Sequence, residues 1–552
     1  MFNKLKRKGM TLSVIASLIL VGCGSNNSST NSVDEETLTT LVTKYLTAST
    51  LPTLHTLPTL NDEDGNSTDA RESYTLRATT NVDVTIQTPE GSWITPMWRY
   101  NNSPLPLVIN TSRGTEMTLN FENNLTSDST IHWHGFKIPA IMDGGPDVPV
   151  APNTTKAYTF TMNQPAAPLW FHPHPDMQTG KQVYMGLAGV YILHDAITDE
   201  LENSKQLPSG EKDTILLVQD RRFTSGIDGI KELVYMNLEQ DSDGMLGDTI
   251  LVNGSVMPKQ EVSNTLHRYR LYNVSNARNY DFALSDGSEF SIVGTDGGLL
   301  AKPIKVDHIM LGAAQRVEIV IDFSKYSVGE KVLLVSQPFN EDIMGMMGAS
   351  TNGMGISTPT NTNSIEGVLA NGTTLGIMRF DITKSEIEDI VLYDALPTTA
   401  EITTRLTEND ATNKGNERKF VMSMDMSQDM GNMDATMQMH FVINGKTFDI
   451  NRVDEFIESG ATEIWSISNI SPMAHPFHAH AIQYQILDRD GIPAKGVDLG
   501  WKDTFLVQPD ETIRVIGDFS SAEGDYMYHC HILEHEDAGM MGYFRVGESG
   551  VF

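Results

Sequence analysis

The sequence of 552 residues contains few cysteines and a deficit of basic residues. Its only cysteines are Cys23 and Cys530, too few for a disulfide framework to be the source of stability. Basic residues number 39 against 71 acidic residues, which gives a formal net charge of −32. Such a surface repels phosphate backbones, so we expect no nucleic-acid partner; the simplest interpretation of the acidity is that it favours solubility.

The N-terminus has the layout of an export signal. A basic segment at residues 4–8 precedes an apolar stretch at residues 10–22, which is too short to span a bilayer as a mature helix. The run Leu-Val-Gly-Cys at residues 20–23 resembles the lipobox of bacterial lipoproteins, in which the cysteine is acylated. We therefore expect a signal peptide over residues 1–22, lipid attachment at Cys23, and a membrane-anchored protein of the bacterial cell envelope that faces the periplasm or the exterior. A plain export signal is the alternative.

The remaining chain has the pattern of an all-β protein. Residues 23–72 are rich in Ser, Thr, Asn, Asp and Pro, which predicts a flexible linker. Beyond them, short runs of β-branched residues such as 317–323 and 512–519 are bounded by Gly, Pro, Asn and Asp. Convincing amphipathic helices are few. This regular spacing predicts several β-sandwiches in series.

Histidine carries the functional signal. A single His-x-His pair on a strand is weak, because two residues apart simply share a face and most such pairs are surface or core histidines. Here four such pairs occur, two near each end of the chain. Imidazoles gathered in this number would repel one another if protonated, so a metal centre is the better interpretation. The four segments contain ten of the 15 histidines: His132, His134, His172, His174, His475, His478, His480, His529, His531 and His535.

The donor set indicates copper rather than zinc. One thiolate and ten imidazoles are too many histidines for one zinc site. Cys530, with His475, His535 and Met540 available, fits the two-histidine, one-cysteine, one-thioether set of a blue-copper site. In the order His-Cys-His on a strand, Cys530 points to one face and its neighbouring histidines to the other. One strand can thus serve two metal sites at once.

These motifs, in this order, resemble those of the multicopper oxidase family, which includes laccases, ascorbate oxidase and cuprous oxidases. The resemblance covers the chain from about residue 79 onwards and implies three cupredoxin-type Greek-key β-sandwich domains, over residues 73–200, 201–383 and 384–552. It also implies four coppers per chain, with a trinuclear cluster between the first and third domains and a middle domain that acts as a spacer. Dioxygen is the implied electron acceptor.

The resemblance assigns the copper ligands by motif position. Type 1 copper is expected to bind His475, Cys530, His535 and Met540; type 2 copper His132 and His478; one type 3 copper His134, His172 and His531; and the other His174, His480 and His529.

Three residues are expected to act in catalysis. Cys530 would carry electrons from the type 1 copper to the trinuclear cluster. Asp143 and Glu536 match family positions for carboxylates that hydrogen-bond waters at the cluster and relay protons, and such acids also orient the ligands. The alternative is a turn aspartate and an exposed glutamate.

Within the family, the flanking motifs resemble bacterial cuprous oxidases, such as Trp-Phe-His-Pro-His at residues 170–174 and Trp-Lys-Asp-Thr at residues 501–504. Two methionine-rich stretches, at residues 344–354 and 422–439, are expected to be loops or partial insertions and suit Cu(I), because thioether sulfur is a soft donor. The expected substrate-site residues are Met473, Asp342, Met344 and Met346.

One departure weakens this match, since Ser471 stands where cuprous oxidases have an aspartate. A laccase that oxidises small organic reductants such as phenols is therefore the alternative. From another class, a catalytically inactive copper-binding or storage protein stays open, although such relatives lose copper ligands and this chain retains the full set.

Overall fold

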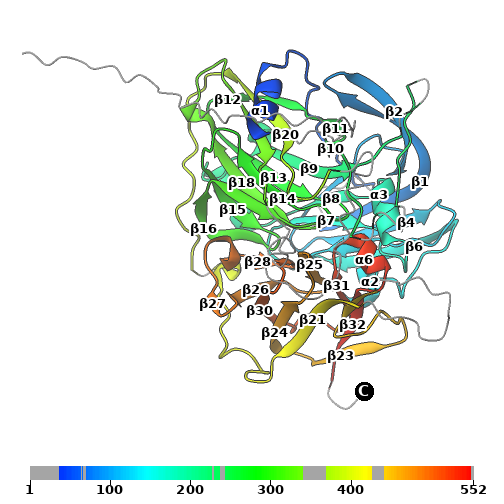
Figure 1. Cartoon of the computed structure of the whole chain (residues 1–552). Coiled ribbons are helices and arrows are strands. Elements are labelled where there is room, and N and C mark those ends of the chain that lie inside the picture. The colour runs from blue at the N-terminus through cyan, green and yellow to red at the C-terminus, as the bar shows by residue number, and fades with distance from the viewer. Residues whose placement is uncertain are drawn as a thin grey trace, which may run out of the picture. The chain divides into compact units, whose positions relative to one another are not determined.

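The computed structural model describes residues 37–548, except 64, 66–69, 225, 227–228, 237–240, 242, 340–368, 399 and 426–439. Nearly all of its regular elements are strands, which confirms the predicted all-β class (Figure 1). The predicted signal peptide, Cys23, Asp342, Met344 and Met346 lie outside the described residues. In the described part of the chain, no helix is long and apolar enough to cross a membrane.

The strands fall into three groups along the chain, and the first group forms what we call the first sandwich. In one of its sheets β1 pairs with β2 and β4, and β4 pairs with β6; its second sheet has the order β3-β8-β7-β5. On β4 every second residue is buried (Met117, Leu119 and Phe121), because alternate side chains of a strand face the same side. The elements are β1 (Arg71–Thr88), β2 (Gly91–Tyr100), β3 (Val108–Ser112), β4 (Glu116–Asn123), β5 (His132–His134), β6 (Thr154–Thr161), β7 (Pro168–His172) and β8 (Gly189–His194), with helices α2 (Ala140–Asp143), α3 (Thr179–Met185) and α4 (Ala196–Asn203).

The middle sandwich continues one sheet of the first, because β1 pairs in parallel with β11 at Gln87 and Ser255. That sheet runs on in the order β11-β10-β9-β13-β18-β15-β16, and a second sheet has the order β12-β20-β19-β14-β17. Its strands are β9 (Asp213–Arg221), β10 (Thr249–Val252), β11 (Ser255–Val256), β12 (Lys259–Ser263), β13 (Leu266–Asn273), β14 (Tyr280–Leu284), β15 (Phe290–Thr295), β16 (Gly298–Val306), β17 (His308–Leu311), β18 (Arg316–Asp322), β19 (Lys331–Ser336) and β20 (Leu375–Lys384).

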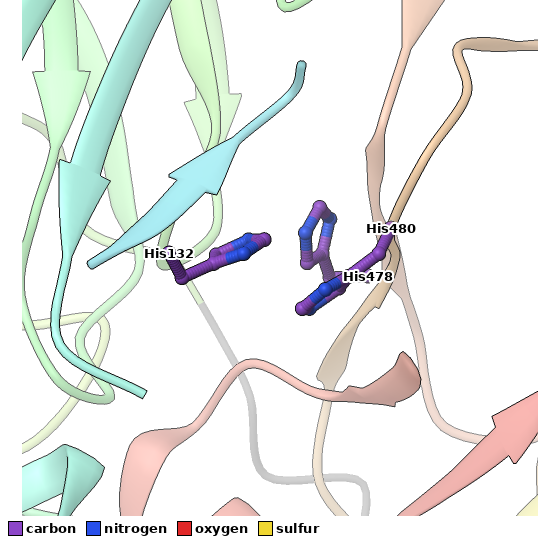
Figure 2. Close-up of side chains that lie close together, drawn as sticks. All are labelled: His132, His478 and His480. Atoms are coloured by element: carbon purple, nitrogen blue, oxygen red, sulfur yellow. The ribbon is translucent and has the colours of Figure 1, made fainter. Parts of the chain in front are cut away.

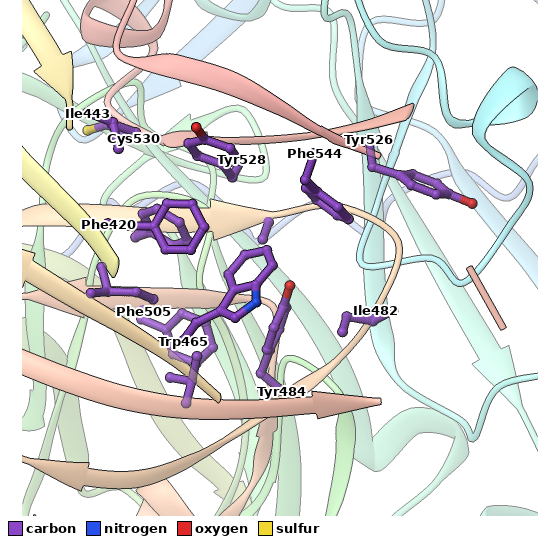
Figure 3. Packing of buried hydrophobic residues seen from close by; sticks show 14 of the residues in the cluster. Phe420, Ile443, Trp465, Ile482, Tyr484, Phe505, Tyr526, Tyr528, Cys530 and Phe544 are labelled. Carbon is purple, nitrogen blue, oxygen red and sulfur yellow. The ribbon is translucent and has the colours of Figure 1, made fainter. Parts of the chain in front are cut away.

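The third sandwich encloses an aromatic core in which Trp465 and Phe420 pack with ring centroids 4.6 Å apart, and Cys530 lies at the edge of this core (Figure 3). One sheet has the order β22-β21-β24-β30-β26-β27 and the other β23-β32-β31-β25-β29. The elements are β21 (Arg418–Asp425), β22 (His440–Ile443), β23 (Val453–Glu458), β24 (Thr462–Asn469), β25 (His475–Ala479), β26 (Tyr484–Arg489), β27 (Ile492–Pro493), β28 (Trp501–Lys502), β29 (Thr504–Val507), β30 (Thr512–Asp518), β31 (Gly524–Cys530) and β32 (Met541–Gly547), with helix α6 (Leu533–Asp537).

The predicted linker, residues 23–72, is not a flexible chain where the structure describes it, at residues 37–63, 65 and 70–72. The described part begins with helix α1 (Leu38–Thr47), which buries Leu41 in a small apolar cluster of the middle sandwich. Arg379 of β20 donates to the carbonyl oxygens of Tyr45 and Ala48, both at 2.8 Å, at the end of this helix. The sequence does contain a signal for this helix, because Leu38, Leu41, Val42, Tyr45 and Leu46 recur at the spacing of one helix face. The three domain boundaries stay predictions.

One methionine stretch also differs from expectation. Met422 was expected in a loop or insertion, but it lies in β21 and is buried in the core of the third sandwich. Strand alternation explains this position, because Phe420 and Met422 share one face of β21.

Candidate metal centre

Strands from the two ends of the chain bring the predicted histidines together. In the first sandwich β5 pairs with β7, so that His132 lies opposite His172. In the third sandwich β25 pairs with β31, so that His478 lies opposite His529. Figure 2 shows His132 pointing from the first sandwich towards the rings of His478 and His480 of the third. All ten motif histidines are buried.

Eight of these histidines form one cluster between the first and third sandwiches. Its ring nitrogens form overlapping groups of three. Within each group the three nitrogens all lie within 4.8 Å of one another. His531 joins the cluster through its ring, which lies 5.1 Å from that of His134 and 5.4 Å from that of His172 between centroids. The groups are His132 with His478 and His480; His132 with His134 and His172; and His174 with His480 and His529.

Hydrogen bonds at the outside of the cluster fix which ring nitrogen faces inward. The Nδ1 atoms of His132, His172 and His478 lie 3.0, 2.8 and 2.8 Å from main-chain carbonyl oxygens, to which they donate. Their Nε2 atoms are buried without a hydrogen-bond partner. His134 is reversed, because its Nε2 contacts Asp503 and its Nδ1 is the atom without a partner. Unpaired imidazole nitrogens that converge in this way are the arrangement that binds a metal ion.

A second group of inward nitrogens lies beside the first. The Nε2 of His529 is 3.4 Å from the Nε2 of His174 and 3.2 Å from that of His480. Three imidazoles cannot all satisfy one another at this point, because a neutral ring has only one N–H to donate. A metal ion would satisfy all three lone pairs.

Burial favours the neutral form of several imidazoles of the cluster. It lowers the pKa of His172 to about 3 and that of His174 to about 4, with His174 adding repulsion to the former. Burial and neighbouring histidines also hold the pKa values of His132, His134 and His480 well below their usual range. A neutral imidazole is the form that binds metal, so the site is electrostatically prepared for cations.

A smaller cluster surrounds the thiol of Cys530. Its Sγ lies 3.3 Å from the Nδ1 of His475 and 3.7 Å from the Nδ1 of His535. Met540, on the segment that follows, is fully buried, and its carbonyl oxygen accepts from the Cys530 amide at 3.0 Å. Burial raises the pKa of the thiol, so a bound metal is needed to hold it as a thiolate. These residues fit the predicted blue-copper set.

The two clusters share β31 and the residue after it, as strand alternation predicts. His529 and His531 direct their rings into the eight-histidine cluster, while Cys530 between them faces His475. The thiol and the two imidazoles are therefore separated only by side-chain and main-chain bonds of adjacent residues. This is the geometry expected for electron transfer from one metal site to another.

The two predicted acids are buried and contact histidines. The Oδ2 of Asp143 accepts from the Nδ1 of His480 at 2.6 Å. The carboxylate of Glu536 lies 2.9 Å from the Nδ1 of His529 and 3.5 Å from that of His174. Each acid thus orients a histidine of the cluster, and neither is the exposed or turn residue of the alternative interpretation.

Environment separates the two carboxyl groups. Burial raises the pKa of Asp143 well above its usual range. Burial acts in the same direction on Glu536, but His174 and His529 outweigh it and lower the pKa to about 2. Two acids at one centre with pKa values shifted in opposite directions can hold a proton at Asp143 while Glu536 stays ionised.

Asp503 is a site residue that sequence reasoning missed, although it lies in the quoted segment 501–504. Its Oδ1 is 3.0 Å from the Nε2 of His134, and its carbonyl oxygen accepts from the Nδ1 of His478 at 2.8 Å. Burial alone would raise the pKa of Asp503, but Arg316 of β18 outweighs it and lowers the pKa to about 2. The motif was the available signal for Asp503; no local pattern pointed to Arg316.

Ser471 also has a role that the sequence did not suggest. Its buried hydroxyl lies 2.7 Å from the Nε2 of His475 and 2.8 Å from the Oδ1 of Asn469. The hydroxyl can accept from the imidazole and donate to the amide oxygen. Met473 is half-buried beside the core of the third sandwich, whereas most methionines of the two rich stretches lie outside the described residues.

Comparison with known proteins gives a consistent assignment. Family models described as multicopper oxidase match residues 81–197, 198–351 and 419–550. The multicopper oxidase mco of Staphylococcus epidermidis is 33% identical over 451 residues, which cover 81% of this chain and 83% of the relative. The laccase structure from Pediococcus acidilactici has a TM-score of 0.71 and 32% identity, and it covers 90% of this chain and 93% of its own.

Two further similar proteins are described with roles that differ from each other. A structure described as a multicopper oxidase from Campylobacter jejuni, a metallo-oxidase, has a TM-score of 0.71 and 28% identity over 90% of this chain and 96% of its own. The cell division protein FtsP of Photorhabdus laumondii is 28% identical over 462 residues, covering 82% of this chain and 85% of the relative. With its matched models and the buried histidine and cysteine clusters, the chain belongs to the multicopper oxidase family and is a copper-dependent oxidoreductase with four coppers as its cofactor.

Proposed function

We propose that this oxidase converts Cu(I) to Cu(II) in copper tolerance and transfers the electrons to dioxygen. The proposal rests on the residues that surround His475. This ring is fully buried, and Met473 is the half-buried thioether two residues before it. Ile470, on the same segment, is 64% exposed, so residues 470–473 connect the surface to the buried ligand. A small soft ion can bind there, since thioethers select Cu(I).

The laccase alternative needs a reductant that approaches an imidazole edge. The rings of His475 and His535 are both fully buried, and Phe441 stacks on His535 with centroids 3.7 Å apart. This closure disfavours a flat phenol at either ring. The alternative is still worth testing, because a similar structure bears the name laccase. An inactive copper-binding role is disfavoured by the intact ligand set, in spite of the likeness to FtsP.

We propose the following ligands, which are the assignments expected from the motifs. The contacts of 3.2 and 3.4 Å around His529 support one type 3 group, and those around the Cys530 thiol support the type 1 group. The proposed sets are His475, Cys530, His535 and Met540 for type 1; His132 and His478 for type 2; His134, His172 and His531 for one type 3 copper; and His174, His480 and His529 for the other.

The residues of the chain supply paths for electrons and protons. When bound, the coppers would take one electron from each of four Cu(I) ions and pass the four to dioxygen, which consumes four protons and gives two waters. Cys530 provides the short covalent link between the two clusters. Asp143, with its raised pKa, is suited to hold a proton beside His480, whereas Glu536, with its lowered pKa, stays ionised and orients His529.

We also propose that the protein is a lipoprotein of the cell envelope, anchored through Cys23. The basic, apolar and Leu-Val-Gly-Cys segments of the N-terminus support this placement. An enzyme that removes Cu(I) outside the cytoplasm would meet both dioxygen and incoming copper there.

The ligand assignment predicts how acid affects the metal-free protein. In the unfolded chain these histidines bind protons below about pH 6.5, whereas folded His172 and His174 do so only near pH 3 and 4. The unfolded state therefore binds more protons, and each such histidine lowers the free energy of unfolding by about 1.4 kcal/mol per pH unit below 6.5. The thermal midpoint of the metal-free protein should fall between pH 7.5 and 5.5, and less steeply for His172→Asn. An unchanged slope in that variant would contradict the prediction; His308→Asn, at a half-exposed histidine, is the control.

The single cysteine of the core gives the second prediction. Cys530→Ser replaces the only thiol beside His475 and His535 with a hydroxyl of similar size, so the third sandwich should still fold. We expect the blue absorption and all oxidase activity to disappear, while the eight-histidine cluster still binds copper. Absorption spectra, copper content and oxygen uptake measure this. A variant that stays blue would refute the type 1 assignment.

Ser471 is predicted to lower the reduction potential of the type 1 site. An acceptor on the Nε2–H of His475 makes the ring a better donor to the oxidised metal. Ser471→Ala should raise the potential by tens of millivolts, on the scale of about 59 mV per tenfold change for one electron. Ser471→Asp should lower it, and Ser471→Thr, which keeps the hydroxyl, should leave it unchanged. Redox titration of the blue band decides, and equal potentials for the Ala and Thr variants would disprove the role.

Substitution of Met473 tests whether Cu(I) is the reductant. Met473→Leu preserves an apolar side chain but removes the thioether, so KM for Cu(I) should rise roughly tenfold, the size expected for one contact to a metal. Oxygen uptake with a phenol should stay the same or increase. Met185→Leu, at a half-buried methionine of α3 in the first sandwich, is the matched control. The proposal fails if Met473→Leu leaves Cu(I) kinetics unchanged, or if phenol turnover exceeds Cu(I) turnover in the unaltered enzyme.

A further inference from the structure

A buried ion pair joins the middle sandwich to the histidine cluster. Arg316, the first residue of β18, donates to both carboxylate oxygens of Asp503, at 2.6 and 2.7 Å. Arg316 is 1% exposed and Asp503 is fully buried. The middle sandwich contributes none of the proposed copper ligands, so an arginine at this position has no obvious reason to approach the cluster.

The carboxylate that Arg316 holds contacts histidines from both ends of the chain. Its Oδ1 accepts from the Nε2 of His134, which leaves the Nδ1 of that ring facing the cluster. The carbonyl oxygen of the same Asp503 accepts from the Nδ1 of His478. A displacement of Asp503 would therefore rotate one proposed type 3 ligand and one proposed type 2 ligand.

The main chain beside His134 accommodates this ion pair only because residue 135 is glycine. Gly135 has a φ of +87°, which side chains rarely adopt. A Cβ there would lie 2.6 Å from the Oδ2 of Asp503 and 2.8 Å from the Nη2 of Arg316. The ion pair is thus packed directly against the strand that carries His132 and His134.

The other donors of Arg316 fix its position. Its Nε donates at 2.8 Å to the carbonyl oxygen of Pro168, the first residue of β7, whose last residue is His172. Its Nη2 also reaches the carbonyl oxygen of Asp296, at 3.2 Å. One guanidinium of the middle sandwich therefore contacts a histidine-bearing strand of the first sandwich and the key carboxylate of the third.

We propose that Arg316 is a positioning residue for the trinuclear copper cluster, so that the middle domain clamps the two ligand-bearing domains instead of serving as a spacer. Stability alone is a weak reason for a buried ion pair, because desolvation of both charges offsets much of their attraction. Orientation is a better reason, since only the planar fork of arginine gives two parallel bonds to one carboxylate. The inference rests on the proposed ligand assignment of His134 and His478, but not on the identity of the reductant.

The test is Arg316→Lys in the copper-loaded, full-length protein. Lysine keeps the positive charge but loses the fork, so Asp503 should shift and disturb His134 and His478. We expect the paramagnetic resonance signal of type 2 copper to change and the copper content after dialysis against a chelator to fall from four towards one. The blue absorption should persist, because the type 1 ligands all come from the third sandwich.

Arg268→Lys is the matched control. Arg268, on the neighbouring β13, is equally buried and pairs with Glu318 of β18 and with Glu202 of α4, with 3.0 Å between its Nη1 and the Oε1 of Glu202. It should lower the thermal midpoint as much as Arg316→Lys does but keep four coppers and the type 2 signal. The proposal is overturned if Arg316→Lys retains four coppers and an unchanged type 2 signal, or if Arg268→Lys loses copper and type 2 signal to the same extent. If the unaltered protein lacks a type 2 signal, the ligand assignment itself fails.

Discussion

The neutrality of the buried imidazoles is the constraint on which the rest of the molecule depends. Protonated rings would repel one another, and neutral rings leave inward nitrogens unpaired at a cost of about 1–3 kcal/mol each unless a metal binds them. Such a cluster can form only if the two ends of the chain are held together before the metal binds. The outer hydrogen bonds to carbonyl oxygens, and the carboxylates of Asp143, Glu536 and Asp503, contribute to this by holding the outward-facing nitrogen of most of these rings.

The same constraint explains why the thiol stands where it does. Cys530 belongs to the apolar core of the third sandwich, where burial raises its pKa, while its sequence neighbours belong to the polar cluster. Only a strand places adjacent residues in two such different environments. The Cys530 site therefore has apolar surroundings and the histidine cluster is rich in titratable groups, yet the residues of the two sites are adjacent in the sequence. A helix would have spread these side chains around its axis.

The sequence was sufficient for what is local and insufficient for what is distant. Four spaced motifs predicted the class of fold, both clusters and the opposite faces of β31, because a strand period and ligand chemistry are properties of neighbouring residues. Arg316 could not be found in this way, since it lies 187 residues from Asp503 and in no motif. Helix α1 and buried Met422 had local signals, a helical apolar period and strand alternation with Phe420, but the Ser- and Thr-rich and methionine-rich composition around them favoured a linker and a loop. Ser471 was noticed only as a missing carboxylate, although its hydroxyl hydrogen-bonds to His475.

The serine at position 471, where cuprous oxidases have an aspartate, changes how a cation could be attracted to the proposed type 1 site. A neutral hydroxyl at Ser471 offers no charge to the proposed substrate Cu(I), so under that proposal selectivity has to come from the softness of thioethers such as Met473. Long-range attraction can then be supplied by the net charge of −32, which raises the local concentration of any cation without choosing among them. A neutral acceptor also stabilises oxidised type 1 copper less than a carboxylate would, so the site remains a better oxidant. Weak binding by soft ligands, combined with a higher driving force, suits the proposed reaction, because the Cu(II) product is harder than Cu(I) and prefers oxygen ligands.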